Sequence, residues 1–390
     1  MPPWAVTRTP TTMNLRKLIR RLFIAVVVLV AALAVWSRAG RRPPDTAANL
    51  NLSEVHSLGR DTGNGNLLGI QPYMLAADYA TEARFHQKLD GYLAAAREKG
   101  LIGTKTVVVF PEFLGSWLVV TGEKRTVYEA RTVKEAATLI ALSNLPSFMS
   151  AYLGARARDR MTAALFRMKA RKMADIYQRV FSGLAKDYGV TIVAGSILLP
   201  SPQVKDGNLL AGDGPLYNTT VVYGPDGRAR EPAVRKVFPT KEEQPFVSPG
   251  SVDDLPVFET PAGKLGVLIC ADSWYPEAYR QLRRLGAELI AVPSLGSAKA
   301  DAVWQGYSGF PNPEDVDPAD VGHLSEGEAW AKYALPGRLP ESGARAGVNV
   351  FLRGRLWDLT LDGLAFAARG NEVATYRGED GSIVNVWIGR

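Results

Sequence analysis

The segment Gly266-Val-Leu-Ile-Cys-Ala-Asp-Ser-Trp-Tyr-Pro276 contains the single cysteine of the chain and has the pattern of a strand that leads into a helix. Its first four residues form an apolar run that predicts a buried strand ending at Cys270. A short turn follows, and Pro276 suits the first turn of a helix, where its missing N–H is not needed. A strand-to-helix turn exposes a side chain at the sheet edge, which is the geometry that a nucleophile needs. Most lone cysteines are instead inert packing residues, so both interpretations stay open at this point.

The composition narrows the kinds of site that the chain can hold. It has 390 residues, 46% of them hydrophobic, which suffices for one large domain or two ordinary ones. A single cysteine excludes an intramolecular disulfide and a zinc site built from several thiolates. The three histidines are scattered, so a His-rich metal centre is not expected either. We therefore predict no metal site.

The positive charge of the chain is concentrated at its N-terminal end. The formal net charge is +7, but residues 1–44 contain eight basic side chains and no acidic one. The rest of the chain carries 38 basic against 39 acidic residues and is therefore close to neutral. A near-neutral domain gives no reason to expect a phosphate backbone as a partner. We predict no nucleic-acid binding.

An apolar run near the N-terminus predicts a membrane segment. Leu22–Trp36 is 15 residues long and uncharged, whereas a spanning helix needs about 20 residues. Arg20 and Arg21 can snorkel to the membrane surface and let Leu18 and Ile19 join the span. Five basic residues precede the run and three follow it, and this bias places the N-terminus in the cytoplasm and the rest outside. A membrane-anchored protein with its main domain outside the cytoplasm is the favoured interpretation.

Signal-peptide cleavage is the alternative, because Ala32-Leu-Ala34 resembles a small-x-small cleavage site. The protein would then be secreted. Residues 37–66 are rich in Arg, Pro, Asn, Gly and Asp and have no apolar period, which predicts a linker. The predicted organisation is a basic segment 1–21, a signal anchor or signal peptide 22–36, a linker 37–66 and a single folded domain 67–390.

Strands and helices alternate through the first half of that domain and strands pair more closely afterwards. This order predicts an α/β or α+β layered domain. Residues 295–327 are rich in Pro, Gly and Asp and are predicted to be a long loop. The helices are expected at 80–99, at 123–189 with a break near 143–147, and at 276–285. The strands are expected at 66–71, 106–110, 190–197, 217–223, 233–238, 257–259, 265–269, 288–292, 348–352 and 382–388.

A basic stretch lies inside the long helical region. Residues 156–172 contain seven basic residues and one acidic residue, with apolar side chains interleaved. A basic amphipathic helix suits a membrane surface. A solvated face over an ordinary core stripe is the simpler interpretation, and we prefer it.

A catalytic cysteine needs a group that removes its proton or lowers its pKa. The three histidines stand in no motif-like context. Glu112 instead follows an apolar strand as Phe-Pro-Glu, and Lys236 ends another short strand as Val-Arg-Lys. A glutamate can accept the thiol proton, and a lysine ammonium favours the thiolate and the oxyanion of a tetrahedral intermediate. Each signal is weak alone.

In combination these segments resemble the nitrilase, or carbon–nitrogen hydrolase, superfamily. The resemblance covers about residues 67–365, and the segment around Cys270 is its most specific part. The motifs that carry it are the strand ending at Gln71, Val-Val-Phe-Pro-Glu112, Tyr188-Gly-Val-Thr-Ile-Val-Ala-Gly195, Tyr217-Asn218, Gly224-Pro-Asp-Gly227, Arg235-Lys236, Gly266-Val-Leu-Ile-Cys270-Ala-Asp272, Pro276-Glu277, Gly286-Ala287, Pro293-Ser294, and Arg345-Ala346 with Asn349.

The resemblance implies an α-β-β-α sandwich preceded here by one N-terminal hydrophobic helix. It implies a catalytic triad of Glu112, Lys236 and Cys270, with a thioester acyl-enzyme and no metal or organic cofactor. A second glutamate often follows the lysine in this family, for which Glu243 is the candidate and Glu242 the alternate. Homo-oligomers are common in the family and are the default expectation.

The sequence departs from the family at two motif positions. Ala271 replaces the aromatic residue that usually follows the cysteine, and Val348 stands where the family has a glutamate. The stretches 112–195 and 295–327 are also longer than expected, and both would shape access to the site. We expect Trp117, Trp274 and Tyr275 to line the substrate pocket and Asp272 to hold the turn.

These expectations favour an exported amidase-type hydrolase that acts on a small-molecule amide or a lipid-linked amide. One alternative is an N-acyltransferase that passes the acyl group from the thioester to an amine. Against it, that branch of the superfamily has several membrane spans, and this chain offers at most one. The second alternative is a non-catalytic binding module with the same fold.

Overall fold

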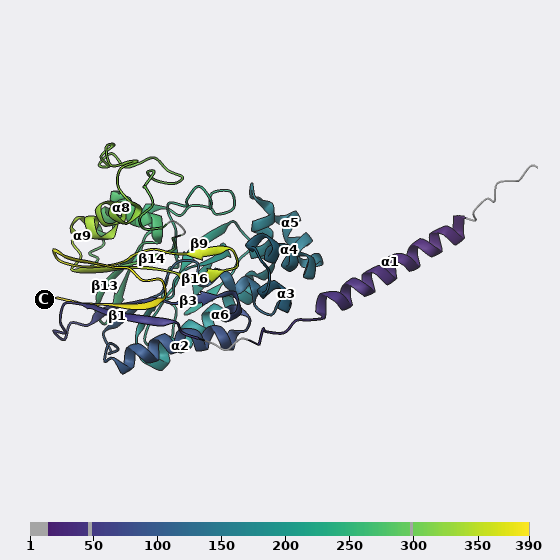
Figure 1. Cartoon of the computed structure of the whole chain (residues 1–390), viewed down its shortest axis with the longest axis horizontal. Coiled ribbons are helices and arrows are strands. Elements are labelled where there is room, and N and C mark those ends of the chain that lie inside the picture. The colour runs from purple at the N-terminus through teal and green to yellow at the C-terminus, as the bar shows by residue number, and fades with distance from the viewer. Residues whose placement is uncertain (1–14, 46–48, 297–298, 390) are drawn as a thin grey trace, which may run out of the picture.

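The computed structural model describes residues 15–45, 49–296 and 299–389 (Figure 1). Two six-stranded sheets form the centre of the domain. The first has, in spatial order, β1 (Leu52–Leu58), β20 (Gly381–Trp387), β2 (Asn66–Gln71), β4 (Thr106–Val109), β5 (Thr191–Val193) and β10 (Val222–Tyr223). The second has β12 (Val257–Thr260), β13 (Gly263–Val267), β14 (Leu289–Ser294), β15 (Ala346–Phe351), β18 (Ala365–Arg369) and β19 (Glu372–Tyr376).

Side chains of the first sheet alternate between two cores. In β4, Val108 packs with the helices α2 (Glu82–Glu98) and α6 (Arg160–Tyr188). Its neighbours Val107 and Val109 face the second sheet and share a core with β13, β14 and β15. This period of two is what a strand buried on both faces requires.

The outer face of the second sheet is covered by α7 (Pro276–Arg284) and α9 (Leu335–Ser342), whose apolar residues pack against that face. The sheets approach closely at Gly69, where an added Cβ would lie 2.4 Å from a methyl group of Val350. The order of layers is therefore helix, sheet, sheet, helix, which confirms the α-β-β-α sandwich.

The predicted linker 37–66 is wrong in part, because β1 lies inside it. This strand pairs in parallel with β20 and extends the first sheet. Its half-buried positions hold Leu52, Glu54, His56 and Leu58, a mixture of polar and apolar residues. Such a strand has no apolar period, which is why the sequence pattern does not reveal it.

The apolar N-terminal run forms helix α1 (Leu15–Arg38), which projects from the domain (Figure 1). Its segment Arg16–Arg38 is long and apolar enough to cross a membrane, and none of its most apolar window is buried in the domain. The domain holds the C-terminal end of this helix. The Lys124 ammonium lies 4.2 Å from the ring centre of Trp36, and Arg41 forms a 3.3 Å ion pair with the buried Glu123.

The expected helical region after residue 123 is present and breaks near the predicted place. It consists of α3 (Arg125–Tyr128), α4 (Val133–Ser143), α5 (Leu145–Gly154) and α6. The basic stretch 156–172 begins before α6. The interpretation as a solvated face is incomplete, because three of its cations bind other parts of the domain. Lys169 is buried and pairs with Glu123, Lys172 donates to the carbonyl oxygen of Thr121, and Arg167 donates to that of Asp213. These cations stabilise the domain itself.

Short strands complete the structure. The sequence pattern does not predict five of them: β3 (Tyr73–Leu75) pairs with β16 (Arg353–Leu356), β16 with β17 (Leu359–Leu361), and β18 with β19. The remaining elements are β6 (Ile197–Pro200), β7 (Gln203–Lys205), β8 (Asn208–Leu210), β9 (Leu216–Thr220), β11 (Val234–Arg235) and α8 (Glu326–Tyr333).

Candidate active site

Cys270 lies where the second sheet turns into a helix. It follows β13, begins a short 3₁₀ turn that runs to Trp274, and precedes α7. Its φ angle is +51°, in the left-handed region that residues other than glycine rarely adopt. The Ser273 hydroxyl donates to the Cys270 carbonyl oxygen at 2.7 Å and fixes this conformation. Backbone strain of this kind is typical of functional sites.

Asp272 holds this turn against a second segment. One carboxylate oxygen accepts the Ile269 N–H at 3.2 Å, and the other accepts the N–H groups of Val237 and Phe238 at 2.9 and 2.8 Å. Burial raises the pKa of the Asp272 carboxyl to about 7. The aspartate thus positions Cys270 relative to the segment that follows Lys236.

Glu112 comes from the other sheet. It follows β4, and its backbone N–H donates to the carbonyl oxygen of Ser294 at the end of β14. The next residue, Phe113, has a φ of +60°, and its N–H donates to the Ser196 hydroxyl at 2.8 Å. A second strained turn therefore directs Glu112 into the space between the two sheets.

Lys236 brings its ammonium between two carboxylates. Its Nζ lies 2.8 Å from Oε1 of Glu112 and 2.6 Å from Oε2 of Glu243, and all three side chains are buried. Glu243 also accepts the Thr240 N–H at 2.8 Å. The alternate, Glu242, is exposed and accepts from the Ser308 hydroxyl instead.

Asn218 completes this cluster and was not among the predicted site residues. Its amide nitrogen donates to Glu112 at 2.8 Å and to Glu243 at 2.9 Å, so it bridges the two carboxylates. Its backbone carbonyl also accepts the Lys236 N–H at 2.8 Å. The only sequence signal for it was the Tyr217-Asn218 pair within the family resemblance.

Burial and mutual charge control the protonation of the cluster. Burial raises the pKa of Glu112, and the nearby Lys236 ammonium offsets only part of this effect. Burial also lowers the pKa of Lys236, but Glu112 and Glu243 overcome it and raise that pKa well above its usual value. For the Cys270 thiol, burial and the negative charge of Glu112 together raise the pKa. The resting thiol is therefore neutral and needs a base at the moment of attack.

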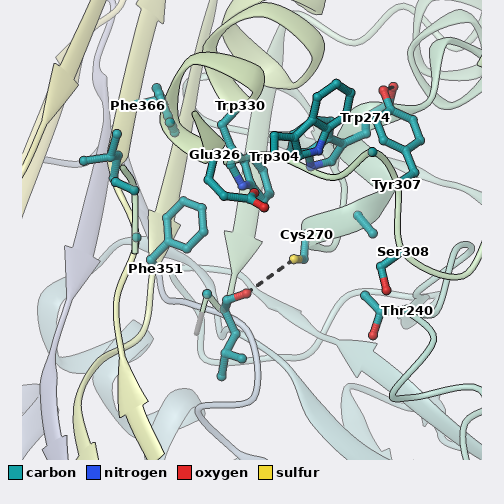
Figure 2. A pocket seen from close by; sticks show the side chains of 18 of the residues that line it. Thr240, Cys270, Trp274, Trp304, Tyr307, Ser308, Glu326, Trp330, Phe351 and Phe366 are labelled. Atoms are coloured by element: carbon teal, nitrogen blue, oxygen red, sulfur yellow. Dashed lines mark hydrogen bonds between the residues drawn. The ribbon is translucent and has the colours of Figure 1, made fainter. Parts of the chain in front are cut away.

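A cleft of about 260 Å³ opens at Cys270 (Figure 2). Of the predicted pocket walls, Trp274 and Tyr275 line it, and so does Ala271, whose small side chain leaves space beside the cysteine. Further walls come from the long loop, from α8 and from the strands β15 and β18, none of which was predicted to line the pocket. They include Trp304 and Tyr307 of the loop, Glu326 and Trp330 of α8, Phe351 of β15 and Phe366 of β18.

The prediction for Trp117 is wrong for this cleft. Trp117 lines a separate apolar cavity of about 280 Å³ that shares only Leu295 with the Cys270 cleft. Its ring packs 5.9 Å from that of Trp357, on the side of the first sheet that carries α4 and α6. At the other departure from the family, Val348 is buried in β15 and packs within the apolar core of the second sheet. Within the described ranges, no group of three or more His, Cys, Asp or Glu side chains is arranged to hold a metal ion.

An α-β-β-α sandwich with a cysteine at its strand-to-helix turn, beside a buried glutamate and lysine, defines a class of layered α/β hydrolases. The sequence model of the carbon–nitrogen hydrolase family matches residues 68–314, and the chain belongs to this family.

The curated relatives match over part of their length. A nitrilase of Pyrococcus abyssi is 38% identical over 111 residues, which cover 28% of this chain and 37% of the relative. Omega-amidase NIT2 of Danio rerio is 35% identical over 150 residues, which cover 36% of this chain and 49% of the relative. The matched segments thus span less than half of these proteins.

Solved structures share the fold. A carbon-nitrogen hydrolase from Helicobacter pylori G27 superposes with a TM-score of 0.51 at 17% identity, covering 83% of this chain and 88% of that one. A double mutant of the amidase from Nesterenkonia sp. AN1, in complex with acrylamide, gives a TM-score of 0.50 at 16% identity, with coverage of 84% and 92%.

Proposed function

We propose that the protein is an amidase-type carbon–nitrogen hydrolase in which Cys270 is the nucleophile, Glu112 the general base and acid, and Lys236 the cation that stabilises the oxyanion. The observation that carries this proposal is the buried cluster of Lys236 with Glu112 and Glu243 next to the strained cysteine. Burying three ionisable groups is costly, so such a cluster favours a catalytic role over a purely structural one.

The reaction begins with a neutral thiol. Glu112 removes the thiol proton as Sγ of Cys270 attacks the amide carbon, and the ammonium of Lys236 stabilises the negative charge that develops on the amide oxygen. The protonated Glu112 then gives its proton to the leaving nitrogen. The C–N bond breaks, ammonia or an amine departs, and the acyl group remains on sulfur as a thioester.

Water completes the cycle. Glu112 accepts a proton from a water molecule as the water oxygen attacks the thioester carbon, and the C–S bond breaks to release the carboxylic acid. The sulfur recovers its proton from Glu112, so the net reaction consumes one water per amide. Glu243 and Asn218 act as positioning residues in this scheme, because they bind the catalytic groups and not the reacting atoms.

Steady-state release of ammonia from simple primary amides tests the activity. We expect turnover that is abolished in Cys270→Ala and strongly reduced in Glu112→Gln. Addition of an amine distinguishes acyl transfer from hydrolysis, because transfer would yield a new amide in place of the acid. A wild-type protein that releases no ammonia and whose cysteine reacts with iodoacetamide no faster than a free peptide thiol would instead support a non-catalytic module.

We also propose that α1 anchors the protein in a membrane, with the catalytic domain outside the cytoplasm. The length, apolar character and exposure of α1 support this, as does the basic excess on its N-terminal side. In this arrangement the substrate is a small-molecule amide or a lipid-linked amide reached at the membrane surface. Self-association into a homo-oligomer is expected from the family and is testable by sedimentation of the detergent-solubilised protein.

A further inference from the structure

The Cys270 cleft is lined by seven aromatic residues and has one charged lining side chain within the described part of the chain. That side chain is Glu326, in the first turn of α8. Figure 2 shows its carboxylate directed into the same space as the Cys270 thiol, beside Trp330. A cleft of this size thus combines the reacting sulfur with a carboxylate that the reaction itself does not use.

Within the described part of the chain, Glu326 forms none of the ion pairs that bind other carboxylates. Burial raises its pKa, and among the described residues no neighbouring cation or hydrogen-bond donor opposes this effect. Glu328, two residues later, contrasts with it: it is exposed and accepts from the Ser325 hydroxyl as the N-terminal cap of the helix. Glu326 is therefore not needed for the helix cap and is free for a ligand in the cleft.

The aromatic rings around this carboxylate hold one another in place. Trp274 stacks on Trp304 with ring centres 5.6 Å apart, and Trp330 meets Trp274 edge-on at 4.7 Å. Trp330 also packs at 5.0 Å against Phe351. Aromatic faces attract cations, and the attraction is strongest where water is largely excluded. A fixed set of rings with one carboxylate is a suitable environment for an organic cation.

We propose that the cleft selects amides that carry a positively charged ammonium group a few bonds from the reacting carbonyl, with Glu326 and the ring of Trp330 binding that group. The proposal rests on the hydrolase function proposed above and adds its substrate class. The ammonium would exchange part of its water shell for the carboxylate and the ring face. Neutral amides would gain neither contact, and anionic amides would be repelled by Glu326.

Three primary amides of similar length test the proposal with the full-length protein: 4-aminobutanamide, the uncharged isostere pentanamide, and the anion succinamate. All release ammonia, so one assay serves for all. We expect kcat/KM for the cation to exceed that for the neutral amide by about tenfold, mainly through KM, and the anion to be the poorest substrate.

Glu326→Gln keeps the shape of the side chain and removes its charge. We expect the ratio of kcat/KM for the cation to that for the neutral amide to fall to about one in this variant. Glu328→Gln is the matched control, because it removes the same charge from the same helix outside the cleft and glutamine also fits that capping position. The control should retain the ratio of the unaltered protein.

The outcomes separate the two proposals. Hydrolysis of pentanamide as efficiently as of the cation by the unaltered protein, or an unchanged ratio in Glu326→Gln, overturns the cation site and leaves the hydrolase function intact. If no amide is hydrolysed, the proposed hydrolase function is wrong, but ligand binding still tests the cation site. Quenching of tryptophan fluorescence in Cys270→Ser should then show tighter binding of 4-aminobutanamide than of pentanamide, and equal binding of the two overturns the proposal.

Discussion

The Nζ atom of Lys236 lies 2.8 Å from Oε1 of Glu112, and each of the two side chains is only 1% exposed. The two residues follow strands of different sheets, β4 and β11, and lie 124 positions apart in the chain. A charge buried so completely depends on its partner, because water cannot replace the lost interaction. The pair therefore links the stability of the site to its chemistry.

Removing the lysine ammonium should lower both the stability of the protein and its catalytic activity. Lys236→Met leaves Glu112 and Glu243 as buried carboxylates without their cation, which costs about 3–5 kcal/mol of unfolding free energy unless they take up protons. Loss of oxyanion stabilisation should lower kcat by about 10²–10³-fold. Urea unfolding and amide hydrolysis measure the two effects. A variant of normal stability and normal kcat would contradict the role given to Lys236.

The pH profile should report the protonation of Glu112. The base must be unprotonated to accept the thiol proton, and burial raises its pKa above the ordinary value of 4.5. Activity should therefore fall as the pH drops through a value above 4.5, by about tenfold per pH unit on the acid side. A plot of log(kcat/KM) against pH measures this limb. Full activity maintained down to pH 4.5 would argue against Glu112 as the base.

Glu243 should affect the position of the acid limb of the pH profile, because its negative charge also raises the pKa of Glu112. Glu243→Gln removes the charge and keeps a group that can bind Lys236. We expect the acid limb to move to lower pH, together with a decrease in kcat. A merely structural role would lower activity without moving the limb. Glu242→Gln is the matched control, since Glu242 is exposed. The acid limb of the pH profile should not move in this variant.

Topology is tested on the full-length chain expressed in a Gram-negative bacterium. Protease added to spheroplasts should digest the domain after residue 66, and the protein should remain with membranes after carbonate washing. Complete protection of the domain would overturn the outward orientation. A soluble mature form that begins just after Ala34 would show that the secreted alternative is correct.

The sequence was most informative where the determinants are local. The turn at Cys270 was predictable because an apolar strand, a short polar turn and a proline follow one another directly. The break between α4 and α5 and the end of α6 at Gly189, with its φ of +64°, follow equally local signals. Glu112, Lys236 and Glu243 were assigned through the family resemblance, and the fold brings them into contact.

The missed features depend on contacts between distant segments. Asn218 gains its position only when β9 pairs with β11, the strand that directly precedes Lys236. The rings of Trp304 and Trp330 reach the cleft through a loop and a helix whose paths no periodicity reveals. Trp117 was misplaced because its distance along the chain from Glu112 is short, yet its side chain lies in a different cavity from Cys270. Strand β1 was missed because its buried face is half polar.

The central claim is that Cys270 forms a thioester with the acyl part of an amide. Rapid acid quenching of the protein during turnover of a hydrolysed amide, followed by peptide mass spectrometry, measures this directly. The peptide containing Cys270 should gain the mass of the acyl group and lose it again after hydroxylamine treatment. Cys270→Ala should show neither adduct nor turnover. Continued hydrolysis by Cys270→Ala would show that the nucleophile is a different group.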